Sequence, residues 1–232
     1  MPLATPLNTA RPADIGLHPQ RTQQVVNVLQ GSVDRRHIPG AVVLIARQGR
    51  IGLFEAVGQQ DPAVGTPMRT DSIFRIYSMT KPLVSVAIMM LAECGQLLIS
   101  DPVSRWLPEY NNQPVLGNAG LVPAWQTPTV QDLLRHTAGL TYEFLGDSAV
   151  QREYAKVNIA SRGRSNDEFS KTLAGIPLQF QPRSCWAYSR ATDVLGRLVE
   201  VISGQTLGQF LQHEIFDPLG MVDTGFAVPP AQ

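Results

Sequence analysis

Lysine is scarce in this sequence, and neither sign of charge predominates. The 232 residues include 19 basic and 19 acidic side chains, so the chain has no formal net charge. Lys81, Lys156 and Lys171 are its lysines, and the arginines are scattered without forming runs. A chain without a basic excess lacks the electrostatic attraction that nucleic acids or anionic membranes require. We therefore expect a small-molecule partner, and neither nucleic acid nor membrane.

Cysteine and long apolar runs are also lacking. Cys94 and Cys185 form neither a Cys-x-x-Cys pair nor a zinc-binding spacing, so we expect reduced thiols in or just below the core. Residues 1–20 contain no apolar segment typical of a signal peptide, and no apolar run is long enough to span a bilayer. We therefore expect a cytoplasmic protein without a metal or cofactor.

The apolar periodicity predicts a helix, a hairpin and then a second helix in the first hundred residues. Residues 19–36 have helical spacing, and two short apolar runs at 41–46 and 51–57 flank a turn at 48–50. Residues 78–94 are the clearest helix, because Pro82 suits a first turn and Gly95 suits a C-cap. Its predicted buried stripe is Leu83, Val86, Ala87, Met90 and Leu91.

The rest of the chain is helix-rich. Residues 100–128 contain many prolines, asparagines and glycines, which indicates an irregular connection. Capping residues and apolar spacing then predict four helices. They are 130–137, with Thr129 and Asp132 as a capping pair and Gly139 at its end, 167–174 after Asn166, 191–203, and 207–215 ending at Pro218.

Ser78-Met79-Thr80-Lys81 is the first candidate site. Ser78 and Lys81 lie almost one helical turn apart and share a helix face, so the lysine could activate the hydroxyl or steer a base to it. A chain of this length carries about one Ser-x-x-Lys match by chance, and a capping serine beside an exposed lysine is the simpler reading. The apolar helix favours function, because it brings Lys81 close to the interior, where an unpaired ammonium is costly.

Tyr188 is the second candidate. It lies in a loop directly before the predicted helix 191–203. A phenol ionises near pH 10, so a tyrosine base needs a shift of about three units, or roughly 4 kcal/mol, from a cation such as Lys81. The alternative is a tyrosine that only anchors the loop. Trp186 nearby suits either the core or a pocket wall.

Other motifs point to simpler roles. Asp223-Thr224-Gly225 matches the aspartic-protease tripeptide, but those enzymes need two carboxylates and this chain has one copy. No His-x-x-x-His pair, Gly-x-Ser-x-Gly elbow or Gly-rich phosphate loop is present. We interpret His136, at the end of a predicted helix, as structural.

An ordered set of landmarks gives these candidates a family context. The set spans roughly residues 20–226 and consists of the segments 74–82, 100–108, 133–140, 188–196 and 216–224. It resembles the serine β-lactamase and penicillin-binding-protein superfamily, specifically the class C-like branch with the family VIII carboxylesterases. The Asp223 tripeptide falls within the last landmark, which removes the protease interpretation.

This resemblance implies an acyl-serine mechanism. Ser78 would be the nucleophile, Lys81 and Tyr188 would share the base and relay roles in an order left open, and the Ser78 N–H would be one oxyanion donor. Tyr77, Trp186 and Arg190 would contact substrate. The implied fold is α/β plus all-α, β-lactamase-like and C-terminally incomplete, helix-rich with an N-terminal antiparallel hairpin. We expect residues 1–77 in the α/β lobe, 78–215 in the helical lobe and 216–232 returning toward the α/β lobe.

Two departures shape the expected activity. Arg190 stands where the family's Tyr-x-Asn motif has asparagine, so we expect cleavage of small carboxylic esters. Activity on β-lactams or D-amino peptides is the alternative. The family's third motif, which gives the other oxyanion N–H, does not occur before Gln232. The remaining hypothesis is therefore an inactive fragment, or a subunit completed by a complementary C-terminal chain, with a homo-oligomer also left open.

Overall fold

The computed structural model describes residues 7–227 of the chain. They form two compact units that divide between Arg75 and Ile76. The N-terminal unit is rich in strands and the C-terminal unit is rich in helices, which is the α/β plus all-α composition that the sequence predicts. The expected three-part division at residues 78 and 216 stays a prediction.

A long antiparallel hairpin dominates the N-terminal unit, as predicted. Gln48 and Gly49 both have positive φ at its turn, 54° and 68°, a conformation that matches the twist of paired strands. The sheet order is β1-β3-β2, and β4 pairs with the C-terminal end of β3. The elements are β1 (Asn8–Thr9), α1 (Pro19–Asp34), β2 (Gly40–Arg47), β3 (Arg50–Asp61) and β4 (Thr66–Pro67).

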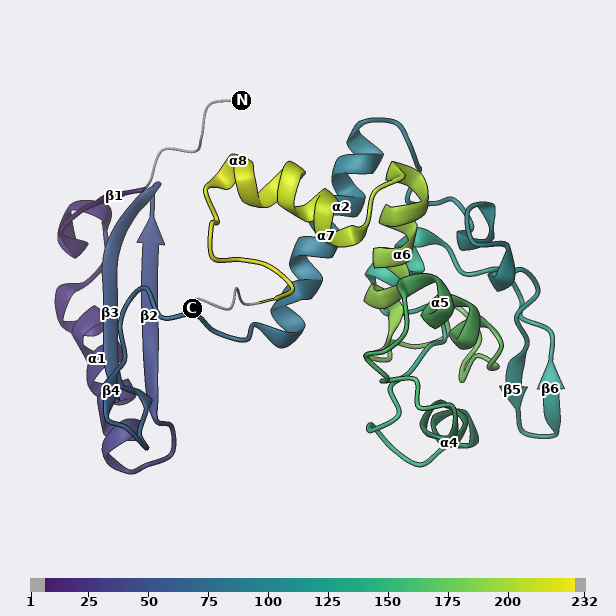
Figure 1. The fold of residues 1–232 in the computed structure, drawn as a ribbon, viewed down its shortest axis with the longest axis horizontal. Coiled ribbons are helices and arrows are strands. Elements are labelled where there is room, and N and C mark those ends of the chain that lie inside the picture. The colour runs from purple at the N-terminus through teal and green to yellow at the C-terminus, as the bar shows by residue number, and fades with distance from the viewer. Residues whose placement is uncertain (1–6, 228–232) are drawn as a thin grey trace. The chain divides into compact units, whose positions relative to one another are not determined.

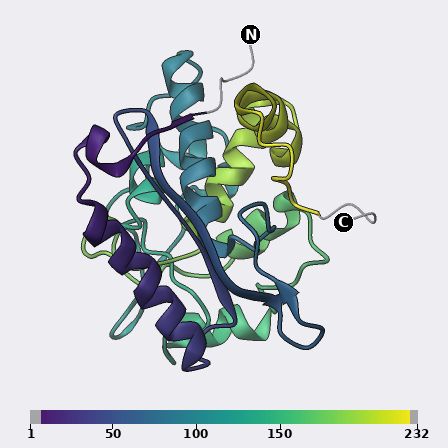
Figure 2. The ribbon, with the colours of Figure 1, turned by 90° about the vertical axis from the view of Figure 1, so that its left-hand side faces the viewer.

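Helix α1 lies along one face of this hairpin, as Figure 1 and Figure 2 show. The helix that the sequence predicts over 19–36 is confirmed, with its last residue at Asp34. Thr22 is buried, while Val26, Leu29 and Val33 are partly buried. Their spacing follows the apolar periodicity that predicts the helix.

Helices α2 and α6 pack against each other in the C-terminal unit, and α3, α5 and α7 pack against α6. Their contact buries the apolar residues Val84, Ala87, Ile88 and Leu91 of α2 and Val194, Leu195, Leu198 and Val199 of α6. The elements are α2 (Thr80–Glu93), β5 (Val115–Gly117), β6 (Gly120–Val122), α3 (Val130–Leu134), α4 (Ala149–Lys156), α5 (Asn166–Ala174), α6 (Ala191–Ser203), α7 (Leu207–Leu211) and α8 (Asp217–Leu219).

The predicted buried stripe of the helix over 78–94 is partly wrong. Ala87 and Leu91 are buried, and Leu83 and Met90 are partly buried against the core. Val86, however, is 48% exposed, and Val84 and Ile88 are buried although the prediction did not include them. Packing against α6 decides which face turns inward, and the periodicity of an almost wholly apolar helix cannot fix that phase. The helix itself is confirmed, preceded by a 3-10 turn at Tyr77–Met79.

Several predicted helix ends differ because of local backbone chemistry. Helix α3 stops at Leu134, since His136 adopts the left-handed conformation expected later at Gly139. Ser165 caps α5 in place of Asn166. The last helix continues past Pro218, because a π turn at Gln212–Phe216 widens it just ahead of the proline. Helix 191–203 is confirmed at both ends.

Some features were absent from the sequence prediction. Helix α4 begins with a capping box of Ser148 and Gln151, a readable signal that was missed. The hairpin of β5 and β6 lies inside the segment expected to be irregular. Cys94 and Cys185 are free, but both are exposed, so their expected placement in or below the core is wrong.

Asp132 ties the start of α3 to a distant loop. Its carboxylate accepts hydrogen bonds from the Thr129 backbone N–H at 2.9 Å and from the Thr129 hydroxyl at 2.7 Å. The Arg183 Nε donates to it at 3.0 Å, and the Asp132 side chain is only 2% exposed. Burial raises the pKa of Asp132, but these hydrogen bonds and the Arg183 charge outweigh it and the net shift is downward.

Asp132→Ala should therefore lower the free energy of unfolding by about 1–3 kcal/mol, because it removes the buried capping-box partner of Thr129 and the carboxylate that pairs with Arg183. Urea unfolding followed by circular dichroism measures this. Glu168→Ala is the matched control: it removes the same capping-box position from exposed helix α5 and should cost about 1 kcal/mol or less.

The cost should also depend on pH. The folded-state pKa of Asp132 is lowered, so its contribution is complete above the pKa of an unfolded aspartate and is lost as acid protonates the folded carboxylate. Equal losses in the two variants would contradict a special role for the Asp132–Arg183 contact.

Candidate active site

Ser78 lies at the N-terminal end of α2, in the 3-10 turn that precedes the helix. Tyr77 directly before it has a positive φ of 43°, an uncommon conformation for a residue with a side chain. Ser78 is exposed, so its hydroxyl is open to a reaction partner. The chain path therefore presents this hydroxyl at the start of a helix whose inner face, Val84, Ala87, Ile88 and Leu91, is packed in the core.

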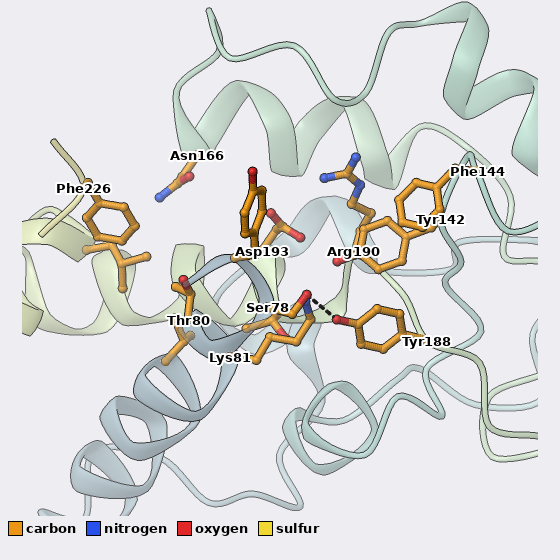
Figure 3. Close-up of a pocket in the computed structure, with 14 residues that line it drawn as sticks. Ser78, Thr80, Lys81, Tyr142, Phe144, Asn166, Tyr188, Arg190, Asp193 and Phe226 are labelled. Carbon is orange, nitrogen blue, oxygen red and sulfur yellow. Dashed lines mark hydrogen bonds between the residues drawn. The ribbon is translucent and has the colours of Figure 1, made fainter. Parts of the chain in front are cut away.

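Ser78, Lys81 and Tyr188 come together at one point, as the sequence predicts. The Tyr188 hydroxyl lies 2.6 Å from the Ser78 Oγ, drawn as the dashed line in Figure 3. The Lys81 Nζ donates to the same Oγ at 3.2 Å. It also lies 4.6 Å from the centre of the Tyr188 ring. One hydroxyl thus has a phenol and an ammonium within hydrogen-bonding distance.

The loop that carries Tyr188 is held by a neighbouring segment, residues 136–141. The Arg183 N–H donates to the Thr137 carbonyl at 2.8 Å, and the Arg190 N–H donates to the Thr141 carbonyl at 3.2 Å. Tyr188 thus lies between two backbone attachments, directly before α6 begins at Ala191. Because α6 packs against α2, the same core sets the relative position of Tyr188 and Ser78.

The shifts of the two ionisable neighbours have opposite directions. The Lys81 ammonium beside its hydroxyl, and then the Ser78 hydrogen bond, lower the pKa of Tyr188. Burial lowers the pKa of Lys81, but its interactions with Tyr188 and Tyr142 outweigh this and raise it overall. Lys81 therefore stays protonated at neutral pH, while the phenol of Tyr188 loses its proton more readily than an ordinary tyrosine.

Tyr142 belongs to the same cluster and was not predicted from the sequence. Its ring centre lies 5.6 Å from the Lys81 Nζ and 5.2 Å from the centre of the Tyr188 ring. Burial raises the pKa of Tyr142, with Lys81 opposing the shift, so its phenol stays neutral. The position of Tyr142, two residues after the Leu133–Leu140 landmark, was the available signal.

Arg190 reaches the site but is already paired. Its guanidinium donates to both carboxylate oxygens of Glu143, at 2.5 and 3.3 Å. It also lies 4.7 Å from the centre of the Tyr142 ring. Both partners of the ion pair are largely buried, at 15% and 17% side-chain exposure. Glu143 was missed by sequence reasoning, because nothing in a single sequence pairs it with Arg190.

A cavity of about 420 Å³ opens beside Ser78. In Figure 3 the aromatic rings of Phe226 and Phe144 lie toward its two ends, with Ser78 and Lys81 between them. Asp193 also lines it, and burial raises the pKa of that carboxyl while Arg190 and Lys81 oppose the shift. The lining also includes residues that the sequence analysis did not single out: Thr80, Val84, Asn166, Thr192 and Leu207.

The predicted substrate contacts differ in their placement. Tyr77 lines the cavity with a side chain that is 76% exposed, and Arg190 lines it as the partner of Glu143. Trp186 is not among the lining residues, and its ring instead packs near the rings of His136 and Tyr188. Substrate binding by these three residues stays a prediction.

Residues 7–227 were compared with the patterns of metal-binding clusters and of membrane-spanning helices. Within that range, no group of three or more histidine, cysteine, aspartate or glutamate side chains is arranged to hold a metal ion. None of the helices in the same range is long and apolar enough to cross a membrane.

Comparison with known proteins finds a matching family, similar sequences and similar structures. A family model described as Beta-lactamase covers residues 25–232. Esterase EstB of Burkholderia gladioli is 40% identical over 201 residues, which are 86% of this chain and 50% of EstB. The structure of EstCE1, described as a hydrolase with promiscuous acyltransferase activity, matches with a TM-score of 0.80 at 34% identity, covering 90% of this chain and 54% of EstCE1.

A third match is simvastatin synthase LovD from Aspergillus terreus, with a TM-score of 0.70 at 30% identity, covering 86% of this chain and 51% of LovD. The chain spans about half the length of the curated relatives it matches. The predicted superfamily and fold class are confirmed. With most of its length matched by the family model, the chain belongs to the Beta-lactamase family, within the superfamily of serine β-lactamases and penicillin-binding proteins, and has esterases among its relatives.

Proposed function

We propose that this chain carries the nucleophile and bases of a serine hydrolase that cleaves small carboxylic esters through an acyl-serine intermediate. The meeting of the Ser78 Oγ with the Tyr188 hydroxyl at 2.6 Å and the Lys81 Nζ at 3.2 Å carries the proposal. Its similarity to esterase EstB over 86% of the chain supports the choice of esters.

In the proposed mechanism Tyr188 takes the first proton. Its pKa is lowered and that of Lys81 is raised, so the phenol is the group that can deprotonate while the ammonium remains. The phenolate then accepts the Ser78 proton, and the Ser78 Oγ attacks the carbonyl carbon of the ester. Lys81 contributes a fixed positive charge beside both oxygens, which stabilises the ionised pair.

The remaining steps use the same groups. Tyr188 returns its proton to the departing alcohol oxygen, which leaves Ser78 acylated. Water then attacks the acyl group, with Tyr188 taking the water proton and returning it to the Ser78 Oγ as the carboxylic acid leaves. The Ser78 backbone N–H would donate to the oxyanion in both halves.

The Arg190–Glu143 pair favours esters over β-lactams. Tyr-x-Asn offers an amide whose oxygen accepts a hydrogen bond, whereas a guanidinium only donates. Here the position offers a substrate neither a free acceptor nor a free donor, because the Arg190 guanidinium is paired with Glu143 and lies against the Tyr142 ring. An ester has no amide N–H that requires such an acceptor, so the substitution does not hinder its binding.

The whole protein's assembly and location are further parts of the proposal. The family pattern includes a third motif that supplies a second oxyanion N–H, and we propose that a complementary C-terminal part supplies it here. Whether the protein also forms a homo-oligomer is a separate question, because a second copy of these 232 residues would lack the same motif. The balanced charge and scarce cysteines support a cytoplasmic location. Catalysis by the 232 residues alone should then be weak, although Ser78 should already be reactive.

Ser78 should react with a fluorophosphonate probe, because Tyr188 and Lys81 activate its hydroxyl. Intact mass should show one adduct, and peptide mapping should place it on Ser78. Ser78→Ala should remove the adduct and lower any ester turnover by about 10⁴-fold or more. Ser85→Ala, about two helical turns further along α2 and outside the cavity lining, is the control and should keep both. Equal labelling of Ser78→Ala would remove Ser78 from the mechanism.

The labelling rate should rise with pH through the ionisation of Tyr188, at a lower pH than an ordinary tyrosine would allow. Lys81→Met removes the cation that lowers this pKa, so the rising limb should move to higher pH. Rates measured across pH at constant ionic strength test this. If the labelling rate of Lys81→Met rises at the same pH as that of the wild type, Lys81 does not lower the pKa of Tyr188.

Glu143→Gln should change the charge preference of the cavity, because it frees the Arg190 guanidinium. Labelling by a carboxylate-bearing fluorophosphonate should become about fivefold to tenfold faster relative to a neutral one, a gain of about 1 kcal/mol. Glu153→Gln removes an exposed acid paired with Lys156 and should leave the ratio unchanged. An unchanged ratio in Glu143→Gln would show that Arg190 does not face the substrate.

A further inference from the structure

We propose that His136 is a positioning residue that fixes Tyr188 against Ser78. This inference rests on the proposed function, and it assigns a role to a side chain that the sequence suggests is only structural. Three contacts carry it, and they fall on three successive residues of the other segment: Ala187, Tyr188 and Ser189. The His136 backbone makes the contact with Ala187, and its imidazole makes the contacts with Tyr188 and Ser189.

The contacts involve the Tyr188 ring itself and the residues directly before and after it in the chain. The Ala187 N–H donates to the His136 carbonyl at 2.9 Å. The imidazole centre lies 5.1 Å from the centre of the Tyr188 ring, with the planes inclined at 51°. The His136 Nδ1 lies 3.1 Å from the Oγ of Ser189, a residue that is 1% exposed. Rotation of the phenol away from Ser78 would therefore break its packing on the imidazole, and a shift of the loop would break a hydrogen bond to His136.

The direction of the Nδ1 hydrogen bond follows from its surroundings. The Ala191 N–H already donates to the Ser189 Oγ at 3.4 Å, which leaves the hydroxyl hydrogen free for the imidazole. Burial, with a smaller effect of the Lys81 charge, lowers the pKa of His136, so the ring is neutral and its Nδ1 can accept. The neutral ring also adds no second cation beside Tyr188.

The backbone gives an independent reason to assign a role to this side chain. His136 has a positive φ of 56°. It closes α3 in a Schellman arrangement, in which the Thr137 N–H donates to the Asp132 carbonyl at 2.8 Å and the His136 N–H donates to the Leu133 carbonyl at 3.2 Å. Glycine is the usual residue at this position, because a side chain there is strained. The contacts with the Tyr188 loop are what offset that strain.

Because the positive φ suits glycine, the effect of the His136 side chain can be tested separately from the effect of the helix end. Glycine at position 136 would keep the helix end, and even the backbone bond to Ala187, while removing the ring and the Nδ1. Asn158 is a matched control on the same chain. It occupies the same position after α4, with a φ of 47°, and the Ile159 N–H donates to the Tyr154 carbonyl at 3.0 Å. Asn158 is exposed, and its side chain is neither a ring partner nor a hydrogen-bond partner of Tyr188.

The test compares three variants by the rate of fluorophosphonate labelling at Ser78 and by the urea midpoint. His136→Gly should slow labelling about ten- to hundredfold at neutral pH, because a small displacement of a catalytic group has effects of that size. Its rising pH limb should move to higher pH, and its urea midpoint should not fall. Asn158→Gly should change neither labelling nor its pH limb.

His136→Asn should recover part of the loss. The Oδ1 of asparagine takes nearly the place of the Nδ1 and accepts from Ser189, and asparagine tolerates positive φ. Labelling of His136→Gly at the wild-type rate and pH limb would overturn the proposal. So would a slower rate that merely follows a lower urea midpoint, since that is what a structural role predicts.

A second readout keeps this inference separate from the proposed function. If the wild-type chain takes no probe at all, the proposed function fails, and hydrogen exchange still tests His136. Peptides covering residues 184–190 should exchange faster in His136→Gly than in Asn158→Gly, because the loop loses its side-chain attachment. Equal exchange in the two variants would show that His136 does not hold the Tyr188 loop.

Discussion

The hydrogen bond between Ser78 and Tyr188 is the constraint on which this site depends. It joins residues that are 110 positions apart, and each lies at the beginning of a helix. Those helices, α2 and α6, bury their apolar faces against each other, so the packing of the core determines the distance between the two hydroxyls. A hydroxyl is a weak nucleophile by itself, and the fold compensates by holding an ionisable phenol beside it.

A single cation organises the electrostatics around that bond. Lys81 lies close to Ser78, Tyr188 and Tyr142, while the second cation in the cavity, Arg190, is neutralised by Glu143. The unpaired charge is thus placed where it lowers the pKa of Tyr188. Asp132 and His136 hold the loop around Tyr188, Asp132 through an ion pair with the half-exposed Arg183 and His136 through ring and hydrogen-bond contacts.

Local patterns in the sequence predicted the parts of the structure that depend on local chemistry. The hairpin follows from two apolar runs around a short turn, and helix 191–203 follows from its spacing and Gly204. The meeting of Ser78, Lys81 and Tyr188 came from spacing together with the family resemblance. The buried face of α2 was mispredicted, because long-range packing against α6 chooses it. Glu143 and the other cavity-lining residues, such as Tyr142 and Asp193, were missed for the same reason, because each depends on which distant segment lies opposite. His136 was placed correctly at a helix end, but its contact with Tyr188 becomes visible only in three dimensions.

The pKa of Tyr188 in the folded protein tests the central claim most directly. Tyrosine labelled with ¹³C at Cζ gives one resonance per residue, and Tyr188→Phe assigns the relevant one. The account predicts that Tyr188 titrates at a lower pH than free tyrosine, while burial keeps Tyr110 and Tyr154 neutral to much higher pH. A Tyr188 resonance that titrates at or above the pH of free tyrosine, in protein whose Lys81 is intact, would contradict it.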